Sequence, residues 1–153
     1  QGKLESLSKG VPPFYEPDLE RLMLKNSTRL CFQAALTDIS EFDVFLVCVG
    51  TPQSDHDDRA SLEQVDAVFD EIIVAAQIHH IRDPAAINVF IKSTVPIGTN
   101  TRLRHKLDMY AEIFSCNLGS NPEFLREGCA INDFFYQNKD RYVVYHSRLF
   151  YLQ

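Results

Sequence analysis

Val44-Phe45-Leu46-Val47-Cys48-Val49-Gly50-Thr51-Pro52 is a run of six apolar residues that leads directly into a turn. A short apolar run bounded in this way is typical of a parallel strand that is buried on both faces. Two more apolar runs follow along the chain, Ile87 to Ile91 and Ile113 to Leu118, and polar or turn-forming residues close both. The sequence therefore predicts three buried parallel strands.

Helical patterns lie between these strands. Apolar residues recur at helical spacing from Leu62 to Ala76, and Ser61 with Gln64 forms a capping-box pattern ahead of them. Leu103, Leu107 and Tyr110 mark a second helix after Gly98-Thr99. Strands that alternate with helices predict an α/β fold with a parallel sheet. The sequence also predicts two further helices, one that begins at Glu16-Pro17 and one from Phe124 to Phe135. Two further strands are predicted, from Arg29 to Phe32 and from Arg141 to Tyr145.

Three polar turns follow the predicted strands: Gly50-Thr51-Pro52, Ser93-Thr94 and Asn121 to Glu127. Ligands of open α/β sheets bind outside the carboxyl ends of the strands, so the three turns predict one shared site. The residues alone favour simpler explanations for each turn. These are turn formation, capping of the next helix by a hydroxyl, and a solvated helix start in which Arg126 bridges two carboxylates.

Composition argues against several classes of protein. The net charge is −6 and the basic residues are scattered, whereas a nucleic-acid interface needs clustered positive charge. No apolar stretch approaches the ~18–20 residues of a membrane span, and the N-terminus lacks the apolar core of a signal peptide. The four cysteines form no C-x-x-C pair, the five histidines show no metal-ligand spacing, and Cys48 and Cys116 read as small buried residues. The expectation is a cytoplasmic protein with no metal, nucleic acid or membrane partner.

Four stretches together resemble the UDP-glucose dehydrogenase family, which also includes GDP-mannose and UDP-N-acetylmannosamine dehydrogenases. Residues 10–22 (GVPPFYEPDLERL) resemble its G-x-P-x-x-EPGL-x-x-L motif, and residues 43–52 (DVFLVCVGTP) resemble its strand ending in VGTP. Residues 91–99 (IKSTVPIGT) resemble KSTVPVGT, and residues 121–128 (NPEFLREG) are similar to a further signature. Four motifs in the family's order form a specific pattern, although one alone would be weak.

The resemblance implies a Rossmann-like, doubly wound domain that binds NAD beside a UDP-sugar substrate. It assigns Thr94 to positioning a water molecule, Glu123 to orienting it in acid–base chemistry, and Glu127 to a place beside the nicotinamide, which makes these three the catalytic residues. The implied NAD contacts are Val49, Gly50, Thr51, Pro52, Ser93, Thr94 and Glu127. The implied UDP-sugar contacts are Glu123, Phe124, Leu125, Arg126 and Glu127.

Two features of the family are absent from this sequence. None of the six glycines forms the G-x-G-x-x-G fingerprint on which the NAD pyrophosphate rests. None of the four cysteines matches the family's catalytic nucleophile, which belongs to a later domain. Asp18 also stands where EPGL has glycine, and Tyr145 where a PDRIVIG-like stretch has glycine.

These departures lead to the expectation of an internal fragment of an NAD-dependent UDP-glucose dehydrogenase. The expected fold is a partial Rossmann-like domain, residues 1–145, that lacks its first β-α-β unit, followed by an unmatched tail, residues 146–153. The family consists of enzymes, but this chain lacks the glycine fingerprint and the catalytic cysteine, so its status as an enzyme stays open. Alone, it is expected to be inactive and to bind NAD weakly. A split gene, a misread frame and a degraded remnant all fit. The alternative function is a non-catalytic α/β remnant that acts as a binding or interaction module.

The doubly wound strand order 3-2-1-4-5-6 gives a further expectation. Arg29 to Phe32 would be the third strand and Val44 to Val49 the fourth, and the sequence has no strand signal for the partners between them. The strand at Val44 to Val49 is then an unpaired sheet edge, and such an edge invites self-association. Residues 1–42 are expected to be the most mobile part.

Overall fold

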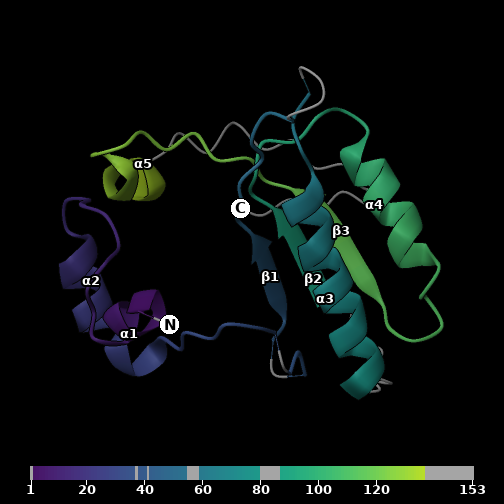
Figure 1. Cartoon of the computed structure of the whole chain (residues 1–153), viewed down its shortest axis with the longest axis horizontal. Helices are drawn as coiled ribbons and strands as arrows, with labels where there is room; N and C mark the ends of the chain where they lie inside the picture. The colour runs from purple at the N-terminus through teal and green to yellow at the C-terminus, as the bar shows by residue number, and fades with distance from the viewer. Residues whose placement is uncertain (1, 37, 41, 55–58, 80–86, 137–153) are drawn as a thin grey trace. The chain divides into compact units, whose positions relative to one another are not determined.

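The computed structural model describes residues 2–36, 38–40, 42–54, 59–79 and 87–136. They divide into two compact units (Figure 1). The sheet unit contains the described residues from 36 to 123, and the terminal unit contains those from 2 to 35 and from 124 to 136.

A parallel sheet organises the sheet unit. Its strands β1 (Val44–Val47), β2 (Ile87–Ile91) and β3 (Cys116–Ser120) lie in the order β1-β2-β3. In the register, Val47 pairs with Ile91 and Ile91 pairs with Ser120, so the three strands end at the same level. The predicted α/β class and the parallel sheet are confirmed.

Helices α3 (Glu63–His79) and α4 (Thr99–Asp108) cover one face of this sheet (Figure 1). Phe45, Val89 and Leu118 are register partners and point to that face because side chains alternate along a strand. Val89 and Ile91 are completely buried there against apolar side chains of both helices. The helices contribute Val65, Phe69, Ile72, Ile73, Ala75, Ala76, Leu103 and Leu107 to this core.

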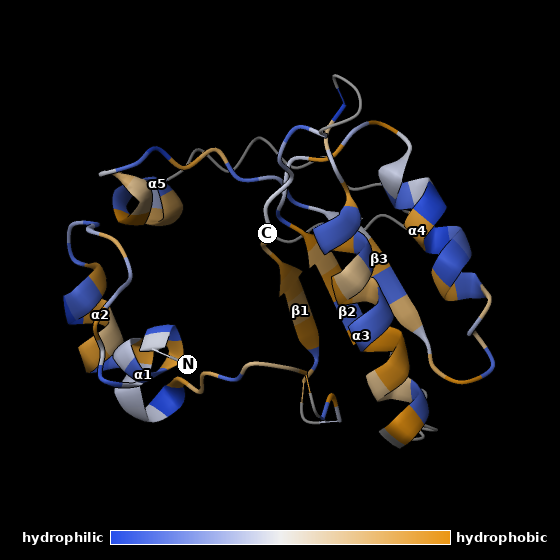
Figure 2. Ribbon diagram, viewed as in Figure 1, coloured by the Kyte–Doolittle hydropathy of each residue, from blue (hydrophilic) through white to orange (hydrophobic). Residues whose placement is uncertain are grey.

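Among the described residues, no helix of the sheet unit lies over the opposite face of the sheet. Val44 and Leu46 point to this face and are 51% and 58% exposed, and β1 is apolar along its whole length (Figure 2). On the same face the ring of Phe90 lies directly over Gly119, where an added Cβ would approach the ring to 2.9 Å. Any side chain at position 119 would therefore force the ring of Phe90 to shift.

Two of the predicted strands have different limits from those expected. The strand predicted from Val44 to Val49 ends at Val47, because the carbonyl of Val47 accepts the backbone N–H groups of both Lys92 and Ser93. The strand predicted from Ile113 to Leu118 begins only at Cys116. Its first residues form a turn in which Ile113 and Phe114 donate to the carbonyl of Tyr110. The strand Ile87–Ile91 is confirmed.

The predicted helices of the sheet unit are present. Helix α3 begins at Glu63 rather than Ser61, and the hydroxyl of Ser61 accepts the Glu63 N–H at 3.5 Å. Helix α4 begins directly after Gly98, whose φ of 91° lies in the left-handed region that favours glycine. None of the described helices is long and apolar enough to cross a membrane.

The terminal unit contains only short helices among its described residues. They are α1 (Gly2–Ser8), α2 (Leu19–Lys25), the 3₁₀ turn η1 (Ser27–Arg29) and α5 (Ala130–Tyr136). The strand predicted from Arg29 to Phe32 is wrong, because Arg29 ends η1 and the residues that follow it pair with no strand in the part of the chain that the structure describes. The helix predicted from Phe124 begins only at Ala130, so Glu123 and Glu127 do not share a helical face. Arg141 to Tyr145 lie outside the described residues.

Asp18 adopts a backbone conformation that favours glycine. Its φ of 66° and ψ of −9° match the third residue of a type II turn, and Pro17 precedes it at the position where proline is preferred. The N–H of Leu19 closes this turn on the carbonyl of Glu16 at 3.1 Å. The backbone geometry thus explains why the family's EPGL motif has glycine at this position. Asp18 adopts the same positive φ with a side chain and is therefore strained.

Asp18→Gly is expected to raise the free energy of unfolding by roughly 0.5–1 kcal/mol, because glycine adopts positive φ without the steric cost that other residues carry. The substitution also removes an exposed Asp18–Arg21 ion pair, whose contribution is small. Urea unfolding followed by circular dichroism measures the change. As a matched control, Glu20→Gly introduces glycine inside α2 and should destabilise by about 1 kcal/mol. Equal destabilisation by both variants would show that Asp18 is not strained.

Candidate functional site

The turns after β1 and β2 are bound to each other at the carboxyl end of the sheet. The hydroxyl of Ser93 donates to the carbonyl of Val49 at 2.6 Å, and the hydroxyl of Thr51 donates to the carbonyl of Thr94 at 3.0 Å. These two hydrogen bonds run in opposite directions between the turns. They fix Val49 to Pro52 beside Ser93 and Thr94, as the sequence predicted for a shared site.

The turn after β3 is held by the end of β2. Asn121 donates its backbone N–H to the carbonyl of Ile91 at 2.9 Å, and Glu123 donates its own to the carbonyl of Lys92 at 3.3 Å. The amine of Lys92 lies 3.5 Å from Oδ1 of Asn121, at the limit of a hydrogen bond. The end of β2 therefore positions the turns on both of its sides, and the backbone of Glu123 is fixed next to Lys92.

Cys48 belongs to the same group of residues, although the sequence placed it in the core. The prediction of a buried thiol is confirmed for Cys116 and wrong for Cys48, which is exposed and directly follows the end of β1. Partial burial of the Cys48 thiol raises its pKa, the charge of Glu123 raises it further, and the charge of Lys92 lowers it. Cys48 thus lies within electrostatic range of both Lys92 and Glu123. The sequence signal for Lys92 and Cys48 was only their place at a strand end.

The pH dependence of alkylation at Cys48 is expected to report the charges of this site. Because the pKa of the thiol is raised, its alkylation rate should rise at a higher pH than that of an unperturbed thiol. Glu123→Gln should move the midpoint to lower pH and Lys92→Met to higher pH. The measurement is iodoacetamide labelling in a background carrying Cys31→Ser and Cys129→Ser, since Cys116 is buried. Glu71→Gln, on an exposed position of α3, is the control and should leave the midpoint unchanged; the same shift in that variant would contradict the assignment.

The chemistry of these turns fits part of a dinucleotide. Gly50 is exposed, so its backbone is accessible to a ligand. The protons of the Thr51 and Ser93 hydroxyls are already donated to carbonyls, so these oxygens act toward a ligand as acceptors. Ribose hydroxyl groups are donors that suit such oxygens. A diphosphate needs backbone N–H groups or cations instead.

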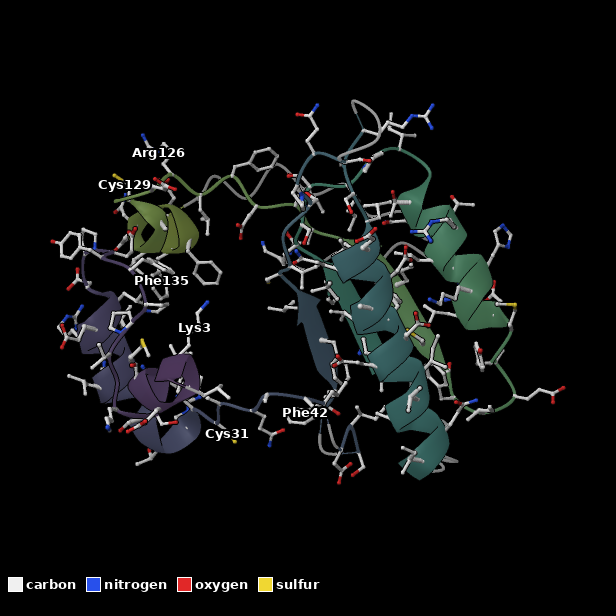
Figure 3. The ribbon with its side chains drawn as sticks, in the orientation of Figure 1. Lys3, Cys31, Phe42, Arg126, Cys129 and Phe135 are labelled. Carbon is white, nitrogen blue, oxygen red and sulfur yellow. The ribbon has the colours of Figure 1, made fainter. Side chains whose placement is uncertain are left out.

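The remaining predicted site residues, Phe124 to Glu127, belong to the terminal unit. Arg126 lies beside α5 (Figure 3) and makes a bidentate ion pair with Asp133, with Nη2–Oδ1 at 2.8 Å and Nε–Oδ2 at 3.0 Å. The pair raises the pKa of Arg126 and lowers that of the Asp133 carboxyl to about 2. Phe124 is 57% exposed. Arg126 is therefore already paired within its own segment, which the spacing of the sequence did not indicate.

The described residues contain no group of three or more histidine, cysteine, aspartate or glutamate side chains placed to hold a metal ion. The charged side chains described above at the strand ends are the amine of Lys92 and the carboxylate of Glu123. For binding and chemistry, the site offers the exposed carboxylate of Glu123, the hydroxyl oxygens of Thr51 and Ser93 as acceptors, and the accessible backbone of Gly50. Such a set can bind sugar hydroxyl groups and exchange a proton with water.

Comparison with known proteins gives a consistent result. Residues 1–146 match the model of the NAD binding domain of the UDP-glucose/GDP-mannose dehydrogenase family. The chain is 39% identical over 146 residues to UDP-glucose 6-dehydrogenase YwqF of Bacillus subtilis, covering 93% of this chain and 31% of that protein. It is 37% identical over 147 residues to UDP-glucose 6-dehydrogenase of Rhizobium meliloti, covering 94% and 32%. The chain thus spans about a third of the length of these relatives.

Solved structures show the same relationship. A UDP-glucose dehydrogenase from Pyrobaculum islandicum superposes with a TM-score of 0.77 at 32% identity, covering 89% of this chain and 31% of that one. A GDP-mannose dehydrogenase from Pseudomonas aeruginosa superposes with a TM-score of 0.78 at 28% identity, covering 90% and 32%. The parallel sheet and its helices are therefore those of a Rossmann-like dehydrogenase domain.

Proposed function

The chain belongs to the UDP-glucose/GDP-mannose dehydrogenase family, and we propose that its residues serve the NAD-dependent oxidation of UDP-glucose to UDP-glucuronate in two successive steps. The family's domain is an NAD-binding domain, so NAD is the cofactor. The observation that carries the proposal is the pair of hydrogen bonds, Thr51 to Thr94 and Ser93 to Val49, that joins two of the family's motifs at the carboxyl end of the sheet. UDP-glucose is favoured because relatives of that name are 39% and 37% identical to the chain.

NAD accepts hydride when it is bound, and the chain supplies positioning and proton transfer around it. Val49 to Pro52 and Ser93 would line the ribose and nicotinamide side, where the fixed hydroxyl oxygens accept hydrogen bonds from ribose. Thr94 would hold a water molecule, and Glu123 would orient it and take its proton. The hydrogen bond of the Glu123 N–H to Lys92 supports this role, because it fixes the backbone from which the carboxylate projects.

The segment that follows Glu123 is proposed to supply contacts to the sugar. Phe124, Leu125, Arg126 and Glu127 are proposed to line the UDP-sugar, with Glu127 beside the nicotinamide. Arg126 would act mainly through its backbone and its alkyl chain, because its guanidinium is engaged by Asp133. We assign residues 1–145 to the dehydrogenase domain and residues 146–153 to a separate tail, in a cytoplasmic protein whose four cysteines are free thiols.

A second candidate function is that of a non-catalytic interaction module. The exposed apolar side chains of Val44 and Leu46 on β1 favour it, since an apolar strand at the side of a sheet can pair with another chain. The two functions differ in what they require of Glu123. Catalysis depends on its carboxylate, whereas pairing along β1 does not.

Glu123→Gln in a chimeric enzyme tests the catalytic proposal. Residues 1–146 of this chain replace the matched segment of the Bacillus subtilis relative, and UDP-glucose oxidation is followed by NADH formation. We expect kcat to fall by about 10²-fold or more with little change in KM, because the carboxylate acts in proton transfer. Glu112→Gln, at an exposed position before β3, is the control. An unchanged kcat with a raised KM would move Glu123 to a binding role.

A further inference from the structure

Glu16 is a buried carboxylate whose bonding connects two distant parts of the sequence. Only 7% of the residue is exposed. Its Oε2 accepts the backbone N–H of Gly128 at 2.9 Å, and its Oε1 accepts that of Ile131 at 3.4 Å. A buried charge is costly unless it is hydrogen-bonded, and bonds from N–H groups to a carboxylate are stronger than those to neutral acceptors. Both oxygens of Glu16 thus bind the end of the NPEFLREG motif, at Gly128, and the first turn of α5, at Ile131.

The turn that carries Glu16 is itself firmly placed in the terminal unit. It closes through the Leu19 N–H and leads into α2. Upstream, Gly10 has a φ of 78° and lies against Leu24, whose Cδ2 would be 2.6 Å from an added Cβ. The chain before Glu16 therefore packs directly on α2, and Glu16 projects from a fixed support rather than from a loose loop.

The receiving segment is closed by its own bonds as well. Asp133 accepts the backbone N–H of Arg126 at 3.1 Å in addition to the guanidinium, and the Cys129 N–H donates to the carbonyl of Arg126 at 3.0 Å. Gly128, with a φ of 74°, turns its N–H toward Glu16. The bonds from Asp133 shape the turn, and those from Glu16 attach it to the turn before α2.

We propose that Glu16 is a positioning residue that anchors the turn from Arg126 to Ile131 and so presents Phe124 to Glu127 for binding a nucleotide sugar. This inference rests on the proposed function for the role of Phe124 to Glu127, but the anchoring itself is a property of the described chain. Glu16 makes no proposed contact with substrate. Its contribution is to fix the backbone from which the contacting residues project.

The test is hydrogen–deuterium exchange of the full 153-residue chain at micromolar concentration, comparing wild type with Glu16→Gln. Glutamine keeps the size of the side chain but replaces one acceptor oxygen with an NH₂ group. We expect at least ~10-fold faster exchange at residues 126–131, and faster exchange also at residues 124–127. Glu20→Gln removes an exposed carboxylate from α2 and serves as the matched control, with no change expected in either segment.

Two results would overturn the inference. Unchanged exchange at residues 126–131 would show that the anchor is not formed, and faster exchange confined to 128–131 would reduce Glu16 to a local cap of α5. The proposed function is tested separately on the same samples, by protection of residues 124–127 upon addition of UDP-glucose. Absence of that protection in the wild type would count against the nucleotide-sugar pocket, while the exchange data without ligand would still decide the role of Glu16.

Discussion

The purified 153-residue chain is expected to produce no NADH from UDP-glucose and NAD. Cys116 cannot serve as a nucleophile, because it is buried beneath the helices and its pKa is raised to about 12. Cys48 lies at the strand ends, but burial and the charge of Glu123 raise its pKa too. Neither Cys31 nor Cys129 stands in a motif that matches the family's nucleophile. The sequence also lacks the glycine fingerprint that holds the NAD pyrophosphate.

The measurement is NADH absorbance with purified chain at a concentration far above that used for a complete relative. The chimera with the Bacillus subtilis enzyme is the positive control, because it joins residues 1–146 to the parts that this chain does not contain. UDP-glucose-dependent NADH formation by the chain alone would contradict the prediction. Such activity would require a nucleophile among the four cysteines, and Cys48→Ser would then identify whether the thiol at the strand ends supplies it.

The sequence predicted the sheet well because its strands are encoded by local pattern. The apolar run Ile87 to Ile91 has strands on both sides, is buried on one face and half-buried on the other, and forms β2 with the limits expected. The predicted start of β3, at Ile113, was wrong because the apolar run begins before the strand does. Phe114 is apolar and buried, but it lies in the turn after α4, so its burial comes from the turn and not from a strand. A hydrophobic residue indicates burial, but it does not show whether the buried residue lies in a turn or in a strand.

The terminal unit was harder to predict because tertiary contacts define it. Arg29 to Phe32 was expected as a strand from its sequence, yet η1 occupies Arg29 and a strand needs a partner that local sequence cannot specify. The segment after Glu123 was expected to be helical, and helix α5 begins only after a turn held by Glu16 and Asp133. These partners are close in space and, for Glu16, distant in sequence. No spacing rule within the segment indicates them.

The candidate site was also predictable only in part: the sequence indicated which turns lie together but not which side chains pair. The turns at Gly50 to Pro52 and Ser93-Thr94 were placed together from the topology of parallel strands alone, and the structure confirms their proximity. The side-chain partners were not predictable, since the pairing of Arg126 with Asp133 depends on where α5 begins. Asp18 is an intermediate case. Its departure from the family motif was visible in the sequence, but the reason for glycine there, a positive φ, required the backbone.

Strand β1 is expected to cause self-association of the chain. It pairs only with β2 among the described strands, so its other side carries no strand, and Val44 and Leu46 are exposed on the open face. An apolar edge of this kind is a template for pairing with another chain. We expect the weight-average mass of the wild type, measured by sedimentation, to rise well above 17.5 kDa between about 5 µM and about 100 µM.

Leu46→Lys should abolish this concentration dependence and keep the mass near 17.5 kDa. A lysine on an edge strand opposes pairing with a second edge, and Leu46 is exposed enough that the free energy of unfolding should change by no more than about 0.5 kcal/mol. Ile97→Lys is the matched control, because Ile97 is a fully exposed apolar residue in the turn before α4 rather than on the edge. Equal effects of both substitutions would indicate general hydrophobic aggregation. A wild type that stays monomeric over the whole range would show that the side of β1 away from β2 is already protected.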